Sequence, residues 1–237
     1  MSKKVKNIPC DLCLSRRKSM FNGLPNDALC ALSEHKSTLA HNKGQVLFLE
    51  GTQPMGLFCI SEGKVKIYKT DDSGREQIVR LAQEGDFLGY RALLSGENYN
   101  SSATILENAK VCFIPKSSFT ELISKDQGFQ NRLMQAVCHD LGIMEQKMAD
   151  MANKTVRQRL ATTLLMLKSS YGVDGDQKTE IDIALTREDL AKIVGTATET
   201  LIRLLSDFKK DGLIDLNGKK ISVLDERALA KEIDLFA

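Results

Sequence analysis

Residues 186–224 carry helix and hairpin signals in an order that few folds accommodate. Thr186 followed by Asp189 resembles a helix capping box, with Asp in place of the usual Glu. Apolar residues then fall on one helix face: Leu190, Ile193 and Val194. Gly195 supplies a tight turn, and a second helix is predicted over 197–209. The inner stripe of that helix is Leu201, Leu204, Leu205 and Phe208.

The opposite face of the second helix points away from this stripe. It carries Thr198, Glu199, Ile202, Arg203 and Ser206. A helix that enters the major groove of DNA presents such side chains near its N-terminal half. Arg pairs with guanine and Glu accepts from the amino group of cytosine, so Glu199 and Arg203 are candidate base readers. An ordinary surface helix accepts the same residues, and this alternative stays open for the helix taken alone.

A basic hairpin follows the two helices. Residues 212–216 and 219–224 read as its strands, and the Asn217-Gly218 pair predicts a type I′ turn. Lys219 and Lys220 stand at its tip, where DNA phosphates would lie. The formal net charge is only +2, so the DNA hypothesis depends on where charges stand. Helix, turn, helix and basic hairpin together predict a winged helix-turn-helix.

The first half of the chain reads as short strands separated by glycines and turns. We predict strands over 46–49, 57–60, 64–68, 77–81, 102–105 and 110–114. Such regular spacing favours a small antiparallel barrel or sandwich. Further along we predict a helix over 156–167, a loop over 171–176 and a strand over 181–185. The fold class is therefore α+β.

An apolar seam lies between these two halves. Its members recur at spacings of three and four: Met134, Val137, Leu141, Met144, Met148 and Met151. Such a narrow stripe suits a long helix that pairs with its twin in a homodimer. Packing of the stripe on the chain's own barrel is the alternative. We divide the chain into an N-terminal cysteine segment (1–22), a barrel sensor (23–125), a dimerisation helix (126–153) and a winged helix-turn-helix domain (154–237).

Other classes of protein find little support in the sequence. No apolar run is long enough to cross a membrane and no secretion signal is visible, so we expect a cytoplasmic protein. His35, His41 and His139 are scattered, and no phosphate-binding loop motif occurs, so we expect no enzyme. A barrel that acts through protein partners rather than DNA is the remaining rival.

Several segments closely resemble the CRP/FNR regulators. They are 185–190, Val194-Gly195, 199–205, the Gly218-Lys219 hairpin and the barrel glycines Gly44, Gly51, Gly63, Gly85 and Gly89. The resemblance implies a cyclic-nucleotide-binding-type barrel (a double-stranded β-helix or jelly roll), a dimerisation helix and a winged helix-turn-helix. It also implies a two-fold symmetric DNA site and RNA polymerase as a partner. By the same resemblance, Thr186, Arg187 and Thr200 are expected to contact DNA phosphates. It also implies that Glu199 and Arg203 read bases.

Cyclic nucleotide is the first candidate signal. Nucleotide-binding barrels that resemble this one hold the ribose with a glutamate and the phosphate with an arginine. Tyr90 stands at the glutamate position, and the arginine position falls within 100–102, which leaves Tyr90, Arg91, Ser101 and Ser102 as the effector pocket. Two lost charge-assisted bonds of about 1.5–3 kcal/mol each would abolish ordinary affinity, so cyclic AMP is not expected.

An iron–sulfur cluster is the second candidate. Cys10, Cys13 and Cys112 coincide with cluster ligands of the FNR-type oxygen sensors that the chain resembles. Ser19 stands at the remaining ligand position, with Cys30 as the other candidate. A thiol redox switch or another metal would use the same thiols. Alternatively, Cys59 and Cys112 are small core residues. The sequence leaves the cofactor open.

Overall fold

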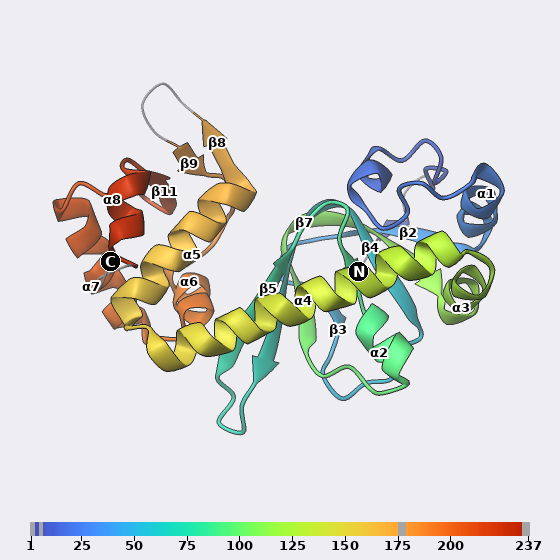
Figure 1. The fold of residues 1–237 in the computed structure, drawn as a ribbon, viewed down its shortest axis with the longest axis horizontal. Coiled ribbons are helices and arrows are strands. Elements are labelled where there is room, and N and C mark those ends of the chain that lie inside the picture. Colours follow the sequence, from blue (N-terminus) through green and yellow to red (C-terminus); the bar gives the residue numbers. More distant parts are fainter. Residues whose placement is uncertain (1–2, 5–6, 175–178, 234–237) are drawn as a thin grey trace. The chain divides into compact units, whose positions relative to one another are not determined.

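The computed structural model describes residues 3–4, 7–174 and 179–233, which form two compact units, 1–141 and 142–237 (Figure 1). The predicted loop residues Gly175 and Asp176 lie outside the described residues. Within the described ranges, no helix combines the length and apolar character needed to span a membrane.

An antiparallel sheet forms most of the first unit. Its strand order is β1-β2-β7-β4-β5, with β3 paired to β7 and β6 paired to β4. The strands are β1 (Lys3–Lys4), β2 (Ser37–His41), β3 (Val46–Phe48), β4 (Gly56–Thr70), β5 (Glu76–Ala82), β6 (Phe87–Leu88) and β7 (Ser102–Pro115). The helices are the 3₁₀ turn η1 (Leu14–Lys18), α1 (Asn26–His35), α2 (Tyr90–Ser95) and α3 (Lys116–Lys125).

The long strands β4 and β7 are the main correction to the predicted strands. The sequence predicts a break at Gly63, but β4 continues through it and shifts register at bulges on either side. Gly63 has φ of +89°, and a Cβ there would stand 2.4 Å from the Asn108 carbonyl oxygen. Glycine is required at that close approach rather than for a turn. Likewise 102–105 and 110–114 belong to one strand, and β2 and α2 were not predicted.

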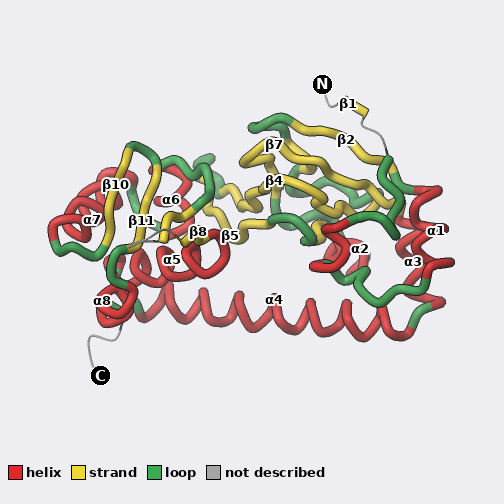
Figure 2. Tube along the Cα trace, turned by 90° about the horizontal axis from the view of Figure 1, so that it is seen from above, coloured by secondary structure: helices red, strands yellow, loops and turns green. Residues whose placement is uncertain are grey.

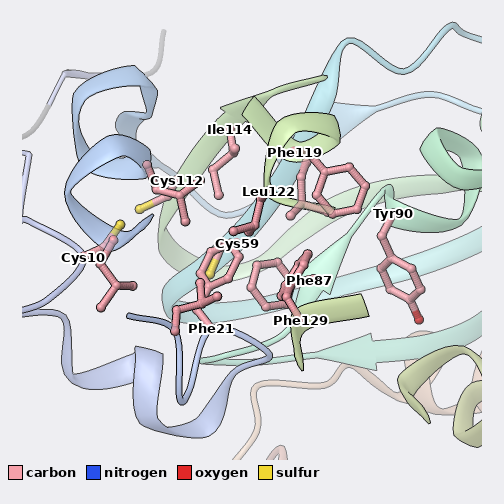
Figure 3. Packing of buried hydrophobic residues seen from close by; sticks show 14 of the residues in the cluster. Cys10, Phe21, Cys59, Phe87, Tyr90, Cys112, Ile114, Phe119, Leu122 and Phe129 are labelled. Carbon is pink, nitrogen blue, oxygen red and sulfur yellow. The ribbon is translucent and has the colours of Figure 1, made fainter. Parts of the chain in front are cut away.

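Two apolar clusters form the core of the first unit. One lies within the sheet and includes Ile60, Val65, Ile105 and Val111. The other joins the sheet to the N-terminal segment and the helices, and Figure 3 shows its members, among them Cys10, Phe21, Cys59 and Phe129. The residues before α1 therefore form part of the core.

The helix α4 (Gln127–Asn153) is one continuous helix (Figure 2). The second unit then contains α5 (Val156–Tyr171), β8 (Gly172–Asp174), β9 (Thr179–Ile181), α6 (Arg187–Val194), α7 (Thr198–Lys210), β10 (Ile214–Asn217), β11 (Lys220–Val223) and α8 (Glu226–Lys231). Its four-stranded sheet has the order β10-β11-β9-β8. The strand predicted over 181–185 is wrong in position, because β9 covers Thr179–Ile181 and shares only Ile181 with the prediction.

Candidate functional site

The two helices predicted over 186–209 form as α6 and α7. Thr186 and Asp189 make a complete capping box: the Thr186 hydroxyl accepts from the Asp189 N–H at 3.0 Å, and the Asp189 carboxylate accepts from the Thr186 N–H at 3.3 Å. Gly195 ends α6 in the left-handed region, with φ of +73°. Leu201, Leu205 and Phe208 bury the inner face of α7, as their spacing predicts.

Arg159 holds the turn between these helices, a role that the sequence analysis missed. Its guanidinium donates to the carbonyl oxygens of Val194 at 3.0 Å and Gly195 at 3.1 Å. It also donates to the carbonyl of Lys154 at 2.8 Å. One cation on α5 thus caps the C-terminus of α6, where carbonyl groups lack partners within the helix. Only the tertiary fold brings Arg159 to this turn.

The outer face of α7 presents the candidate base readers. Glu199, Ile202 and Arg203 are exposed, and Ile202 exposes 51% of its surface. Thr198 and Thr200 are half-buried on the same helix. An apolar side chain between an acid and a base matches the chemistry of a groove that shows thymine methyls beside hydrogen-bonding base edges.

The hairpin of β10 and β11, called the wing below, corrects the predicted turn. Asn217 pairs with Lys220, so the turn residues are Gly218 and Lys219. Positive φ occurs only at glycines in the described ranges, with +59° at Gly218. A glycine at the first turn position matches a type II′ turn and excludes type I′, which needs positive φ at both positions.

Cations at the wing differ in their contacts. Lys219 is exposed, whereas Lys220 forms an ion pair with Glu180 at 2.5 Å, and that carboxylate raises the pKa of Lys220. Arg187 donates to the Gly218 carbonyl at 3.0 Å, and partial burial lowers its pKa. Arg187 thus ties the start of α6 to the wing turn.

The predicted seam lies on α4. Leu133 and Phe129 are buried in the core of the first unit, and Val137 packs partly against it. The other seam members are exposed: Met134 64%, Leu141 58%, Met144 37%, Met148 73% and Met151 43%. The apolar packing of α4 on the core of the first unit therefore involves Phe129, Leu133 and Val137, and most of the seam is left exposed.

The four predicted effector residues have separate partners. The Tyr90 hydroxyl donates to the Asp140 carboxylate on α4, and Arg91 pairs with Glu97 at 3.0 Å. The Ser102 hydroxyl accepts from the Glu50 N–H at 3.0 Å, and Ser101 is half-buried beside it. These contacts direct the side chains to different places, which gives no support to a shared nucleotide pocket.

Four thiols line one small cavity in the first unit. Cys10 and Cys13 come from the N-terminal segment, Cys59 from β4 and Cys112 from β7. In Figure 3 the side chains of Cys10 and Cys112 point toward one another beside Cys59. All six cysteines of the chain are free thiols. Burial raises the pKa of Cys112, and it raises that of Cys59 further.

The two candidates for a fourth ligand differ in position. Ser19 lines the cavity, but its hydroxyl donates to the Arg16 carbonyl at 2.8 Å and accepts from the Phe21 N–H at 3.2 Å. Cys30 is exposed on α1 and does not line the cavity. Cys59 is part of the buried apolar cluster, as one interpretation of the sequence predicts, and it also lines the cavity.

Two cations also border the thiol cavity. Lys36 is 7% exposed, and its ammonium donates to the Ile8 carbonyl at 2.6 Å. Arg16 lines the cavity too, and its buried Nε atom has no hydrogen-bond partner. A buried donor without an acceptor is costly, so this atom marks a place for an anionic or sulfur-rich group. The donor set, several thiols beside two cations, fits a metal group held by thiolates.

The cysteine segment is packed against the first turns of α4. The rings of Phe21 and Phe129 lie 5.7 Å apart, and Arg132 donates to the Met20 carbonyl at 3.0 Å. The cysteine segment and the helix that carries the seam are therefore in direct contact.

Comparisons with known proteins agree with this arrangement. Residues 39–126 match the family of cyclic nucleotide-binding domains, and residues 158–232 match that of Crp-like helix-turn-helix domains. The fumarate and nitrate reduction regulatory protein of Escherichia coli K12 is 30% identical over 205 residues, which cover 86% of this chain and 81% of that protein. The chain belongs to the CRP/FNR superfamily of transcription regulators. The corresponding protein of Vibrio cholerae is 29% identical over 203 residues, which are 86% of this chain and 80% of that protein.

Solved structures show the CRP/FNR fold in the same way. FixK2 from Bradyrhizobium japonicum has a TM-score of 0.75 at 23% identity and covers 83% of this chain and 96% of that one. A CRP/FNR family regulator from Thermus thermophilus has a TM-score of 0.70 at 22% identity and covers 83% and 98%. The predicted barrel, long helix and winged helix-turn-helix are confirmed, as is a DNA-binding transcription regulator rather than an enzyme.

Proposed function

We propose that this CRP/FNR regulator acts as a homodimer that reads a two-fold symmetric DNA site under the control of the thiol cavity. The exposed seam carries the dimer part of the proposal. Five of its six members expose more than a third of their surface on one helix. A contiguous apolar stripe of this kind marks a surface that another protein covers. A second copy of the same helix supplies a matching heptad seam.

In this proposal, α7 reads the DNA sequence. Glu199 and Arg203 read base edges, Ile202 meets a thymine methyl, and Thr198 approaches the groove beside them. Two such helices, related by the dimer axis, reach half-sites about 34 Å apart. Glu199 and Arg203 are exposed, which supports the assignment.

Residues at the edges of the same unit contact the DNA phosphates in this proposal. Thr186 and Thr200 would position the start of each helix on the backbone, and Lys219 and Lys220 would contact phosphates from the wing. Lys220 must first leave Glu180, so Lys219 is the stronger candidate of the two. Arg187 would act by holding the wing turn, because its guanidinium already donates to Gly218.

The thiol cavity is the proposed sensor. Cys10, Cys13 and Cys112 would hold an iron–sulfur cluster, a group that supplies sensitivity to oxidants when bound. Lys36 and Arg16 would offset the negative charge of thiolate ligands. Phe21 and Arg132 would carry a change in the cysteine segment to α4. The separate contacts of Tyr90, Arg91 and Ser102 make cyclic nucleotide the weaker candidate signal.

RNA polymerase as a partner and a cytoplasmic location follow from the family alone. The regulators to which the chain is related act on transcription, and a DNA reader needs access to the chromosome. Both remain expectations for this chain.

Arg203→Ala tests the DNA part of the proposal. Specific sites would be selected from a random DNA pool with the anaerobic protein, and binding measured by fluorescence anisotropy. The variant should lose about 1–3 kcal/mol, concentrated at one base pair of each half-site. Arg227→Ala removes the same charge from an exposed position on α8 and should leave sequence preference unchanged. Unchanged preference in Arg203→Ala would refute the base-reading role.

A further inference from the structure

The thiol cavity contains a cysteine that the spacing of the chain does not reveal. Cys59 on β4 is paired directly with Cys112 on β7 in the antiparallel ladder. Side chains of directly opposed residues project from the same face of a sheet. Cys10 and Cys13 approach that face from the N-terminal segment. Four thiols from three distant parts of the chain therefore border one space.

The other two fourth-ligand candidates are excluded for different reasons, Ser19 by its chemistry and Cys30 by its position. The Ser19 hydroxyl is engaged in the turn that follows η1, through Arg16 and Phe21. An alcohol oxygen is also a poorer ligand for iron than a thiolate. Cys30 is exposed on α1 and does not line the cavity. Cys59 supplies a soft sulfur donor and already lies at the cavity.

A single metal ion and an iron–sulfur cluster place their thiolate ligands differently. A tetrahedral zinc site holds each sulfur about 2.3 Å from one ion. Among the described residues, no group of three or more His, Cys, Asp or Glu side chains is arranged to hold a metal ion, so any metal group requires the thiols to move. A [4Fe–4S] cluster spreads its four thiolates over separate irons, so it needs four sulfurs around a space rather than at a point.

Charge around the cavity favours the same group. Ligation removes the proton from each thiol, and four thiolates around a cluster carry net negative charge. The buried ammonium of Lys36 and the buried Nε of Arg16, which has no partner, face that charge from the cavity wall. Without such cations, a buried anionic group would be strongly disfavoured.

We propose that Cys59, together with Cys10, Cys13 and Cys112, supplies the fourth thiolate of an iron–sulfur cluster, and that Ser19 and Cys30 are not ligands. This assignment rests on the proposed sensor function and names the ligand set of the same site. The free volume of the cavity is about 20 Å³, room for one water molecule. Loading therefore requires the segment that carries Cys10 and Cys13 to move outward.

Anaerobic reconstitution of the full chain with ferrous iron, sulfide and a thiol reductant tests the assignment. Iron and acid-labile sulfide per chain and the visible absorption of the cluster are the readouts. Cys59→Ala should lose nearly all iron, sulfide and colour, whereas Ser19→Ala and Cys30→Ala should match the wild type. Retention in Cys59→Ala, or loss in Ser19→Ala, would overturn the proposal.

Cys59 is buried in a strand, so a rescue variant separates ligation from folding. Ser19 also lines the cavity, and Ser19→Cys in the Cys59→Ala chain should restore at least half of the iron and sulfide. A well-folded Cys59→Ala chain, judged by its thermal transition without iron, that stayed empty in both backgrounds would refute the role of a fourth thiolate. Cys59→Ser keeps the size of the buried side chain and should also load far less iron and sulfide than the wild type; loading to the wild-type level would show that Cys59 is a core residue and not a ligand.

The same experiment distinguishes failure of the inference from failure of the proposed sensor. If the wild type takes up no iron and sulfide, both the proposed sensor function and the assignment of Cys59 as a ligand are refuted. If the wild type and Cys59→Ala take up equal amounts of iron and sulfide, only the assignment of Cys59 as a ligand is refuted. Stoichiometric zinc in place of iron and sulfide would replace the cluster with a single ion and overturn the proposal.

Discussion

The hydroxyl of Tyr90 on α2 donates a hydrogen bond to the carboxylate of Asp140 on α4. Asp140 also accepts from Nη1 of Arg80 on β5 at 2.9 Å. Arg80 and Asp140 side chains are each less than a third exposed. The three residues fasten the sheet to the helix that carries the seam, one turn before Met144.

Tyr90→Phe should weaken this fastening. The ring remains but the donor is lost, so the first unit should lose about 1–2 kcal/mol of unfolding free energy in urea. Tyr68→Phe is the control, because its hydroxyl only accepts from Thr104 at 3.4 Å. Equal effects of the two variants would show that the bond to Asp140 contributes nothing.

Stability should fall in alkaline solution. Burial raises the pKa of Tyr90 to about 12, with the bond to Asp140 adding to it, and burial raises that of Tyr99 to about 12. Below the ordinary value of 10.0 both phenols are protonated in the folded and the unfolded chain. Between pH 10.0 and about 12 only the unfolded chain releases these protons, so the unfolding free energy decreases as pH rises.

Urea denaturation of wild type and Tyr90→Phe at about pH 9 and about pH 12 measures the effect. Each phenol should account for a decrease on the order of 2 kcal/mol, so Tyr90→Phe should show a smaller decrease than the wild type. The same decrease in both chains would mean that Tyr90 titrates normally.

Leu141→Glu should separate the proposed dimer. Two carboxylates would face one another at an apolar contact, and the dissociation constant should rise at least about 100-fold, or about 3 kcal/mol. Analytical ultracentrifugation gives this constant directly. His139→Glu, exposed at the heptad position farthest from the seam, should leave it unchanged. A dimer that survived Leu141→Glu would place the interface elsewhere.

Arg159→Ala should destabilise the helix-turn-helix without removing a side chain that is proposed to contact DNA. Carbonyl groups of Val194, Gly195 and Lys154 lose their donor, so the second unit should lose about 3 kcal/mol of stability. DNA affinity should then decrease by a similar factor on every sequence, unlike the base-specific loss in Arg203→Ala. Differential scanning calorimetry with Arg227→Ala as control measures the stability change. A selective loss of affinity at one base pair would contradict the structural role.

Local periodicity explains which parts of the fold could be predicted. The spacing of Leu201, Leu205 and Phe208 defines one helix face whatever surrounds it, and the Thr186 cap lies within four residues of its partner. The exposed positions of α7 follow from the same geometry. The seam on α4 is another local pattern, and it remains exposed after Val137.

Features that depend on distant contacts could not be predicted. Gly63 reads locally as a strand break, but its close approach to Asn108 makes it a bulge within β4. Cys59 lies opposite Cys112 only because of the register between β4 and β7, which no spacing along the chain encodes. Arg159 meets Val194 and Gly195 in the same nonlocal way. The predicted position of the wing turn was wrong by one residue. The strands pair Asn217 with Lys220, although the Asn-Gly sequence favours a turn at 217–218.

The burial of Phe21 between Phe87 and Phe129 means that the cysteine segment cannot be treated as a tail. Removing it, or pulling it away with a bulky fusion at the N-terminus, would leave aromatic rings of the sheet and of α4 facing water. A change at Cys10 therefore reaches the hydrophobic interior, and α4, the helix that we propose to join two copies of the chain, contributes Phe129 to the same interior.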